Sequence, residues 1–250
     1  PHRGGMSSEG VGDGAGISID LSVSFFSRIT KRKLASGCFG VGNFFLPSDE
    51  RQHCRATHLV EEHLTAAGFK IIKTRDLPVD KNQIRPRAVK WQLPIKQWIF
   101  LPSRETDEQT FERQIHRALL AIEAVAYSDS KLDGLYPLSM SARLQVLKGR
   151  LNSWELIPYF KDLGAKDHLI HTLYFHTRFS TNTDPHPTMA QPFRLMAHNG
   201  ELNTDKKNRL SEAAVALARN KLIVRPKGQS DSCRLDQTLN SRVFDDGLGL

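Results

Sequence analysis

The order of strand-like and helix-like patterns along the chain constrains its fold most. Apolar residues alternate at Ile17, Ile19, Leu21 and Val23, which is the period of a half-buried strand, and an apolar run follows at residues 39–47. Helical patterns then separate further strand-like stretches, without the regular alternation of a parallel, doubly wound sheet. This order predicts an α+β fold made of layered antiparallel strands and helices.

Two stretches have the spacing of amphipathic helices. From about Asp49 to Ala67 the apolar residues fall on one side, and Gly68 stands where a helix commonly ends. The second runs from about Asp107 to Ala126, opens with the capping-box pattern TDEQ and continues with apolar residues at positions 111, 115, 119 and 122. A further helix is predicted at residues 210–220.

Three more stretches predict strands. Residues 69–80 have the composition of a strand that leaves through a proline turn, and residues 135–149 alternate toward a turn at Gly149. The apolar residues 169–180 predict a buried strand that ends in charged and hydroxyl side chains.

Composition predicts a folded cytoplasmic protein. The chain has 250 residues, of which 39% are hydrophobic and 25% charged. No run of 18 apolar residues and no signal peptide is present, so no membrane partner is expected. Three scattered cysteines are too few for a disulfide framework. The net charge of +8 comes from short basic runs mixed with acids, so no nucleic-acid partner is expected either.

Two sequence patterns suggest sites and are better explained without them. The stretch GDGAGI from Gly12 to Ile17 lacks the third glycine of a dinucleotide fingerprint and precedes a strand, so a glycine turn is expected. His53, His58 and His63 are spaced five apart, which rotates each away from the previous helix face, so solvent-facing side chains are expected rather than metal ligands.

The densest polar chemistry lies in HTRFSTNT, AHNGELNT and GQSDS, each next to an apolar stretch. Arg178 has the fork that pairs with a carboxylate, and Asp231 is suited to an ammonium group. The amide of Asn199 beside the backbone N–H of Gly200 supplies two donors for an oxyanion. Together they suit an α-amino acid whose side-chain carbonyl is attacked, although loop capping explains the same residues without a site.

At this point the sequence resembles a known family. The stretch HTRFSTNTDPHPTMAQPFRLMAHNGELNT is similar to the signature of the class II glutamine amidotransferase domain of glutamate synthase large subunits. The stretches HRGGMSSEGVGDGAGI, FGVGNFFLP, FERQIHRALLAIE, LYPLSMSARLQVLKGRLNSWELIPYFKDL and KGQSDSCRLDQTL follow the same family in register. The resemblance covers almost the whole chain.

The resemblance implies a four-layer αββα N-terminal-nucleophile fold, with residues 1–250 forming one amidotransferase domain that is incomplete at both ends. It implies hydrolysis of glutamine to glutamate and ammonia, which a synthase domain of the same polypeptide transfers to 2-oxoglutarate. Arg178 would bind the substrate carboxylate, Asp231 its ammonium group, and Thr181 would support the pocket. Asn199 and Gly200 would form the oxyanion hole.

The resemblance also implies a nucleophile that this sequence does not show. The family uses a cysteine at the start of the mature chain, with its own α-amino group as base, on a strand that precedes the segment matching His2 to Gly4. We therefore expect the nucleophile-bearing strand to be missing and the chain alone to be inactive and poorly soluble. Cys38 is expected to be a small buried side chain, and Cys233 a packing residue.

For the full-length protein the resemblance implies FMN and an iron–sulfur cluster, with no cofactor in this segment. The electron donor would be an NADPH-oxidising small subunit or ferredoxin. The alternative is a catalytically inactive homologue that keeps the glutamine pocket as a regulatory or assembly module.

Overall fold

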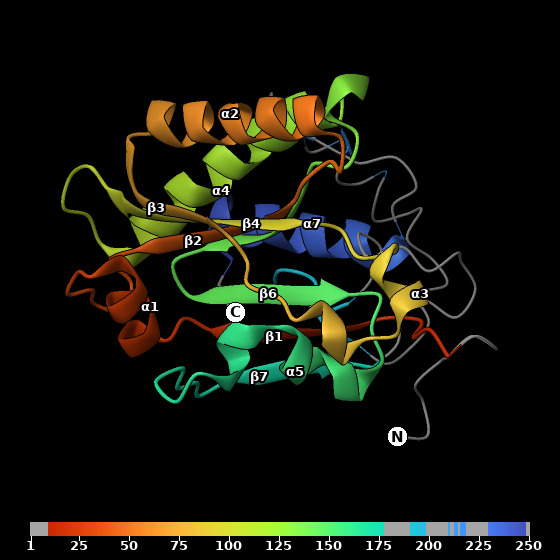
Figure 1. Cartoon of the computed structure of the whole chain (residues 1–250). Helices are drawn as coiled ribbons and strands as arrows, with labels where there is room; N and C mark the ends of the chain where they lie inside the picture. The colour runs from red at the N-terminus through yellow and green to blue at the C-terminus, as the bar shows by residue number, and fades with distance from the viewer. Residues whose placement is uncertain are drawn as a thin grey trace.

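Two antiparallel sheets form the centre of the structure (Figure 1). A computed structural model describes residues 10–177, 191–198, 210, 213–214, 216–218 and 230–248. The first sheet has four strands in the order β3 (Phe69–Asp76), β4 (Ile95–Pro102), β2 (Gly40–Phe45) and β5 (Tyr136–Ser141). The second has three, in the order β6 (Leu144–Gly149), β1 (Ala15–Asp20) and β7 (Leu173–His176). The α+β prediction is confirmed.

Two long helices cover the outer face of the four-stranded sheet, α2 (Glu50–Ala66) and α4 (Glu108–Ala126) (Figure 1). Their apolar stripes pack on the rings of Trp98 and Phe100 in one buried cluster. Full burial of an aliphatic or aromatic side chain typically stabilises a fold by about 1.5–3 kcal/mol. Both predicted helices are therefore confirmed, and the regular spacing of their apolar residues is explained by this contact.

The ends of these helices follow local rules, with one correction. Gly68 has a φ of +79° after the last turn of α2, as a C-terminal glycine should. The cap of α4 is Asp107, whose carboxylate accepts the backbone N–H of Thr110 at 2.9 Å. Thr106, the expected first residue of a capping box, lies one position too early, because the helix begins at Glu108.

The inner faces of the two sheets meet in a second apolar cluster, to which α3 (Pro86–Val89) and α5 (Leu156–Tyr159) also contribute. A chain of amides crosses this core. Gln97 Nε2 donates to Asn43 Oδ1 at 2.8 Å, and Asn43 Nδ2 donates to Gln145 Oε1 at 3.3 Å. Because buried amides are costly unless paired, this chain fixes how the two sheets face each other.

The first predicted strand is shorter than expected. It ends at Asp20, and α1 (Val23–Thr30) follows where the alternating pattern had been extended to Val23. Phe25 and Phe26 are adjacent rather than alternating, and with Ile29 they have helical spacing that directs all three toward a third apolar cluster. The alternating pattern matches the strand as far as Asp20 and does not apply beyond it.

Residues 135–149 form two consecutive strands, β5 and β6, that connect the two sheets. Strand β5 belongs to the four-stranded sheet and β6 to the three-stranded sheet, so the turn between them passes from one layer to the other. The buried carboxylate of Glu112 on α4 holds this corner, accepting Ser141 Oγ and the backbone N–H of Ala142, each at 2.7 Å.

Two expectations about burial were wrong. Strand β7 was expected to be buried, but among the described strands it is the outermost of its sheet, and Tyr174 and Phe175 have exposed fractions of 60% and 64%. Cys38 was expected to be buried, but it is exposed in the turn before β2. The glycines after it pack closely as expected, because a Cβ on Gly40 would overlap the ring of Phe100.

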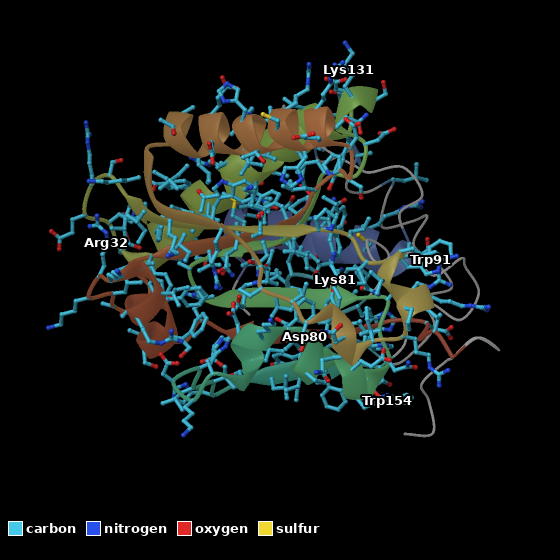
Figure 2. All side chains as sticks on the ribbon, viewed as in Figure 1. Arg32, Asp80, Lys81, Trp91, Lys131 and Trp154 are labelled. Atoms are coloured by element: carbon cyan, nitrogen blue, oxygen red, sulfur yellow. The ribbon has the colours of Figure 1, made fainter. Side chains whose placement is uncertain are left out.

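The remaining elements are short, apart from α7 (Asp231–Phe244), which packs against α4. Four are single 3₁₀ turns: η1 (Lys81–Gln83), η2 (Ser130–Leu132), η3 (Ser153–Glu155) and η4 (Lys161–Gly164). Residues 210, 213–214 and 216–218, within the last predicted helix, are helical. Trp91 after α3 and Trp154 in η3 lie at the surface (Figure 2). Across these described ranges no helix combines the length and hydropathy needed to cross a membrane.

Candidate functional site

Asp231 is the predicted site residue that the structure describes, and it is the first residue of α7. The preceding Ser230 caps the helix, since its Oγ accepts the backbone N–H of Cys233 at 3.2 Å. The side chain of Asp231 is 46% exposed and lies 3.7 Å from Arg234 Nη1. An exposed carboxylate in this position is accessible to a cationic group of a ligand.

The other four predicted site residues, Arg178, Thr181, Asn199 and Gly200, lie outside the described residues. The structure does describe the residues that immediately precede Arg178 and those that immediately precede Asn199. Strand β7 and Thr177 come before Arg178, and the segment 191–198 comes before Asn199.

The segment 191–198 is bound directly to the first turn of α7. His198 Nε2 lies 2.6 Å from Ser232 Oγ, so the residue before Asn199 contacts the residue after Asp231. The backbone N–H of His198 also donates to Gln191 Oε1 at 2.6 Å, which closes the segment on itself. Two of the sequence stretches singled out for their polar chemistry are thus neighbours in space.

A buried carboxylate fixes the middle of the same segment. Asp236 on α7 accepts the backbone N–H groups of Arg194, Leu195 and Met196 at 3.2, 2.8 and 2.9 Å. Burial raises the pKa of Asp236 above its ordinary value of 3.8, while the hydrogen bonds from this backbone and the charge of Arg194 act to lower it. Sequence reasoning missed Asp236. The signal in the sequence was its position three residues after Cys233 and four before Asn240, which places the three side chains on one face of a helix.

Arg194 connects the segment to α4. Its guanidinium forms a buried ion pair with Glu123, a side chain with no exposed surface that also accepts the hydroxyl of Tyr127 at 2.9 Å. Arg194 Nη2 lies 3.4 Å from the carbonyl oxygen of Pro137 on β5. Burial tends to lower the pKa of Arg194, but the Glu123 carboxylate outweighs it and raises that pKa, so the guanidinium stays charged.

Beneath this segment is a small cavity of about 10 Å³, lined by Tyr136, Lys148, Phe193, Arg194, Cys233 and Asp236. Lys148 is fully buried, and its Nζ lies 5.2 Å from the centre of the Phe193 ring. Burial lowers the pKa of Lys148 from 10.5 to about 8. A cavity of this size holds roughly one water molecule. It is too small for an amino acid, so it is a packing space and not a glutamine pocket.

The remaining sequence candidates behave as polar or packing residues. The three cysteines form no disulfide bond, and Cys233 is buried with its Sγ 3.6 Å from the hydroxyl of Tyr136, which confirms the packing prediction. Gly14 has a φ of +132° just before β1, as expected for a glycine turn entering a strand. His58 is exposed and contacts Glu62. Within the described ranges no three His, Cys, Asp or Glu side chains are grouped to hold a metal ion.

Comparison with known proteins identifies the family. The family model described as glutamine amidotransferases class-II matches residues 1–245. The chain belongs to the class II glutamine amidotransferase family. The two antiparallel sheets with covering helices are consistent with the N-terminal-nucleophile fold that this membership implies.

Curated relatives of this family member carry the name glutamate synthase. The NADPH-type large chain of Azospirillum brasilense is 32% identical over 83% of this chain, and the chloroplastic ferredoxin-dependent enzyme of Oryza sativa is 32% identical over 95%. The NADH-type enzyme of Saccharomyces cerevisiae is 29% identical over the whole chain. The chain spans only 13% to 16% of the length of these relatives.

Proposed function

We propose that this chain is the glutamine-hydrolysing domain of a glutamate synthase, which releases ammonia for transfer to 2-oxoglutarate by a synthase domain of the same polypeptide. The match of residues 1–245 to the amidotransferase family carries the proposal. The shared name of the relatives, which extends to proteins of three different electron-donor types, supports its finer part.

The proposed roles divide between binding the substrate and stabilising the transition state. Arg178 binds the α-carboxylate of glutamine, Asp231 its α-ammonium group, and Thr181 supports the pocket. Asn199 and Gly200 donate to the oxygen of the side-chain amide, which becomes negatively charged when the amide carbon is attacked. The capped helix end that exposes Asp231 and the contact between Ser232 and His198 support this division, because they bring the two stretches together.

Hydrolysis of this kind needs a thiolate that adds to the amide carbon, expels ammonia and is then released by water. Cys38, Cys54 and Cys233 lie within the chain, where the α-nitrogen is part of a peptide bond, so none has a free α-amino group to act as its base. Free cysteine is mostly protonated at neutral pH. We therefore expect residues 1–250 alone to show negligible glutaminase activity.

An ammonia-release assay of residues 1–250 tests this expectation. Ammonia production well above the buffer rate that persists in the Cys38→Ser variant would contradict it. Production that disappears in this variant would also contradict it and would identify the exposed Cys38 thiol as the nucleophile.

The proposal assigns one ligand to this domain, and it assigns the cofactors and the electron donor to the rest of the full-length protein. Glutamine is the ligand of this domain. FMN and an iron–sulfur cluster belong to the proposed full-length protein outside this segment, and its electron donor is an NADPH-oxidising subunit or ferredoxin. Relatives named for NADPH and for ferredoxin are equally similar to this chain, since both are 32% identical. Cytoplasmic location stays a prediction, and the Oryza sativa relative is named chloroplastic.

The Arg178→Ala variant of the intact polypeptide tests the assignment of the pocket. Hydrogen bonds to charged groups contribute about 1.5–3 kcal/mol, so the KM for glutamine should rise roughly 10- to 100-fold. Arg143→Ala is the matched control, because Arg143 is an exposed arginine at the β5–β6 turn that pairs with Glu108.

An unchanged KM in Arg178→Ala would refute the assignment. An intact polypeptide that binds glutamine without releasing ammonia would instead support the inactive binding module.

A further inference from the structure

The contact between α7 and the segment 191–198 is more extensive than packing requires. Three successive backbone N–H groups converge on the single carboxylate of Asp236, and Asn240 Nδ2 donates to the same carboxylate at 3.1 Å. Hydrogen bonds to a charged acceptor are about twice as strong as neutral ones. A side chain that accepts four of them in a buried position fixes the local backbone more firmly than apolar contact does.

The segment is also held at both sides of this carboxylate. Arg194 is tied to Glu123 on α4, and His198 is tied to Ser232 in the first turn of α7. Its path is therefore set relative to two helices that pack on each other. Of the two, α7 carries Asp231 five residues before Asp236.

We propose that Asp236 is a positioning residue for glutamine hydrolysis, holding the segment 191–198 in register with the first turn of α7. The inference rests on the proposed function, in which Asn199 and Gly200 form the oxyanion hole. These two residues follow His198 directly in the chain. If the segment 191–198 moves, the proposed oxyanion donors that follow it are expected to move as well, while Asp231 stays on α7. A displacement of about 1 Å can cost a hundredfold in rate.

The proposal predicts a separation of kcat from KM. Oxyanion donors act on the transition state, so their displacement lowers kcat and kcat/KM together. Groups that bind the ground state, proposed to be Arg178 and Asp231, are left in place, so KM should change little. A purely structural role for Asp236 would lower the amount of competent protein without changing the kcat of each competent site.

The experiment compares Asp236→Asn with wild type in the intact polypeptide. The substitution keeps the shape of the side chain but directs an NH₂ group at the N–H of Arg194 and the amide of Asn240. Competent sites are counted with an electrophilic glutamine analogue that alkylates the nucleophile, and kcat is expressed per counted site. We expect kcat to fall roughly 10- to 100-fold, with KM within about threefold of wild type.

Glu112→Gln is the matched control. Glu112 is likewise a buried carboxylate that holds a backbone N–H, but it holds the β5–β6 corner. We expect it to lower thermal stability while leaving the kcat of each counted site unchanged. If Asp236→Asn keeps its kcat within about twofold, or if Glu112→Gln loses as much, the proposal is wrong.

Ser232→Ala keeps the proposal testable if Asp236→Asn does not fold. It removes only the 2.6 Å contact with His198 on a partly exposed turn, and we expect a fall of about three- to tenfold in the kcat of each counted site. An unchanged kcat in this variant would then overturn the proposal. An intact wild-type polypeptide without glutaminase activity would refute the proposed function itself, before any variant is compared.

Discussion

Within the described residues, the four-stranded sheet is covered more completely than the three-stranded sheet. Helices α2 and α4 bury the outer face of the first, and Trp98 and Phe100 have no exposed surface. The second sheet ends at β7, where the side chains of Leu173, Tyr174 and Phe175 are exposed in succession. The same kinds of apolar side chain thus contribute very differently to stability, depending on whether a helix covers them.

The largest expected effect comes from the covered sheet. The ring of Phe100 packs against those of Phe69 and Phe111, with centroids 5.0 and 6.1 Å away. Phe100→Ala should therefore lower the free energy of unfolding by about 3–5 kcal/mol. The same change at Phe175 should cost no more than about 0.5 kcal/mol. Equilibrium urea denaturation of both variants measures the difference, and similar losses would contradict the comparison.

An intermediate effect is expected from the buried amine between the sheets. The pKa of Lys148 is about 8 in the folded chain and 10.5 in the unfolded chain, so the unfolded state binds more protons between these values. The stability cost of burying this amine therefore falls, and the free energy of unfolding rises, as pH increases through this range. From pH 7 to pH 10 the wild type should gain about 2 kcal/mol relative to Lys148→Met.

Denaturation of wild type and variant across this pH range measures the gain. Lys70→Met, at an exposed lysine on β3, is the control and should show no such trend. A difference between wild type and Lys148→Met that stays constant with pH would count against a buried, perturbed amine.

The smallest effect on stability is expected at the exposed edge. Tyr174→Lys adds a charge to an edge strand, which opposes pairing with other chains. We expect the free energy of unfolding to stay within about 0.5 kcal/mol of wild type, while self-association measured by light scattering falls. A loss above about 1 kcal/mol would show that Tyr174 is covered in solution.

Sequence periodicity predicted the elements of the covered sheet best. The predicted helix at 107–126 differs from α4 only in starting one residue earlier. The agreement is close because the apolar spacing reflects one continuous contact with the sheet. Periodicity failed where a local pattern has two explanations. Alternation at 17–23 hid the start of α1, and alternation at 135–149 hid a turn between two layers.

Burial and the proposed site were harder to predict from local patterns. An apolar stretch such as 169–175 has the same letters whether a neighbour covers it or not, so the exposure of β7 could not be foreseen. Asp231 was predicted from its motif, a prediction that stays open, but Asp236 was not singled out, because its contacts are to backbone N–H groups about 40 positions away in the chain.

The pairing of β1 with β6 has a consequence for how the protein is made. Ala15 pairs with Gly149, so β1 has to wait roughly 130 residues of synthesis for this partner, or on the order of ten seconds at ordinary synthesis rates. During that time the apolar residues of β1 have no sheet to join. β1 is thus open to chaperones for as long as its partner strand is unmade.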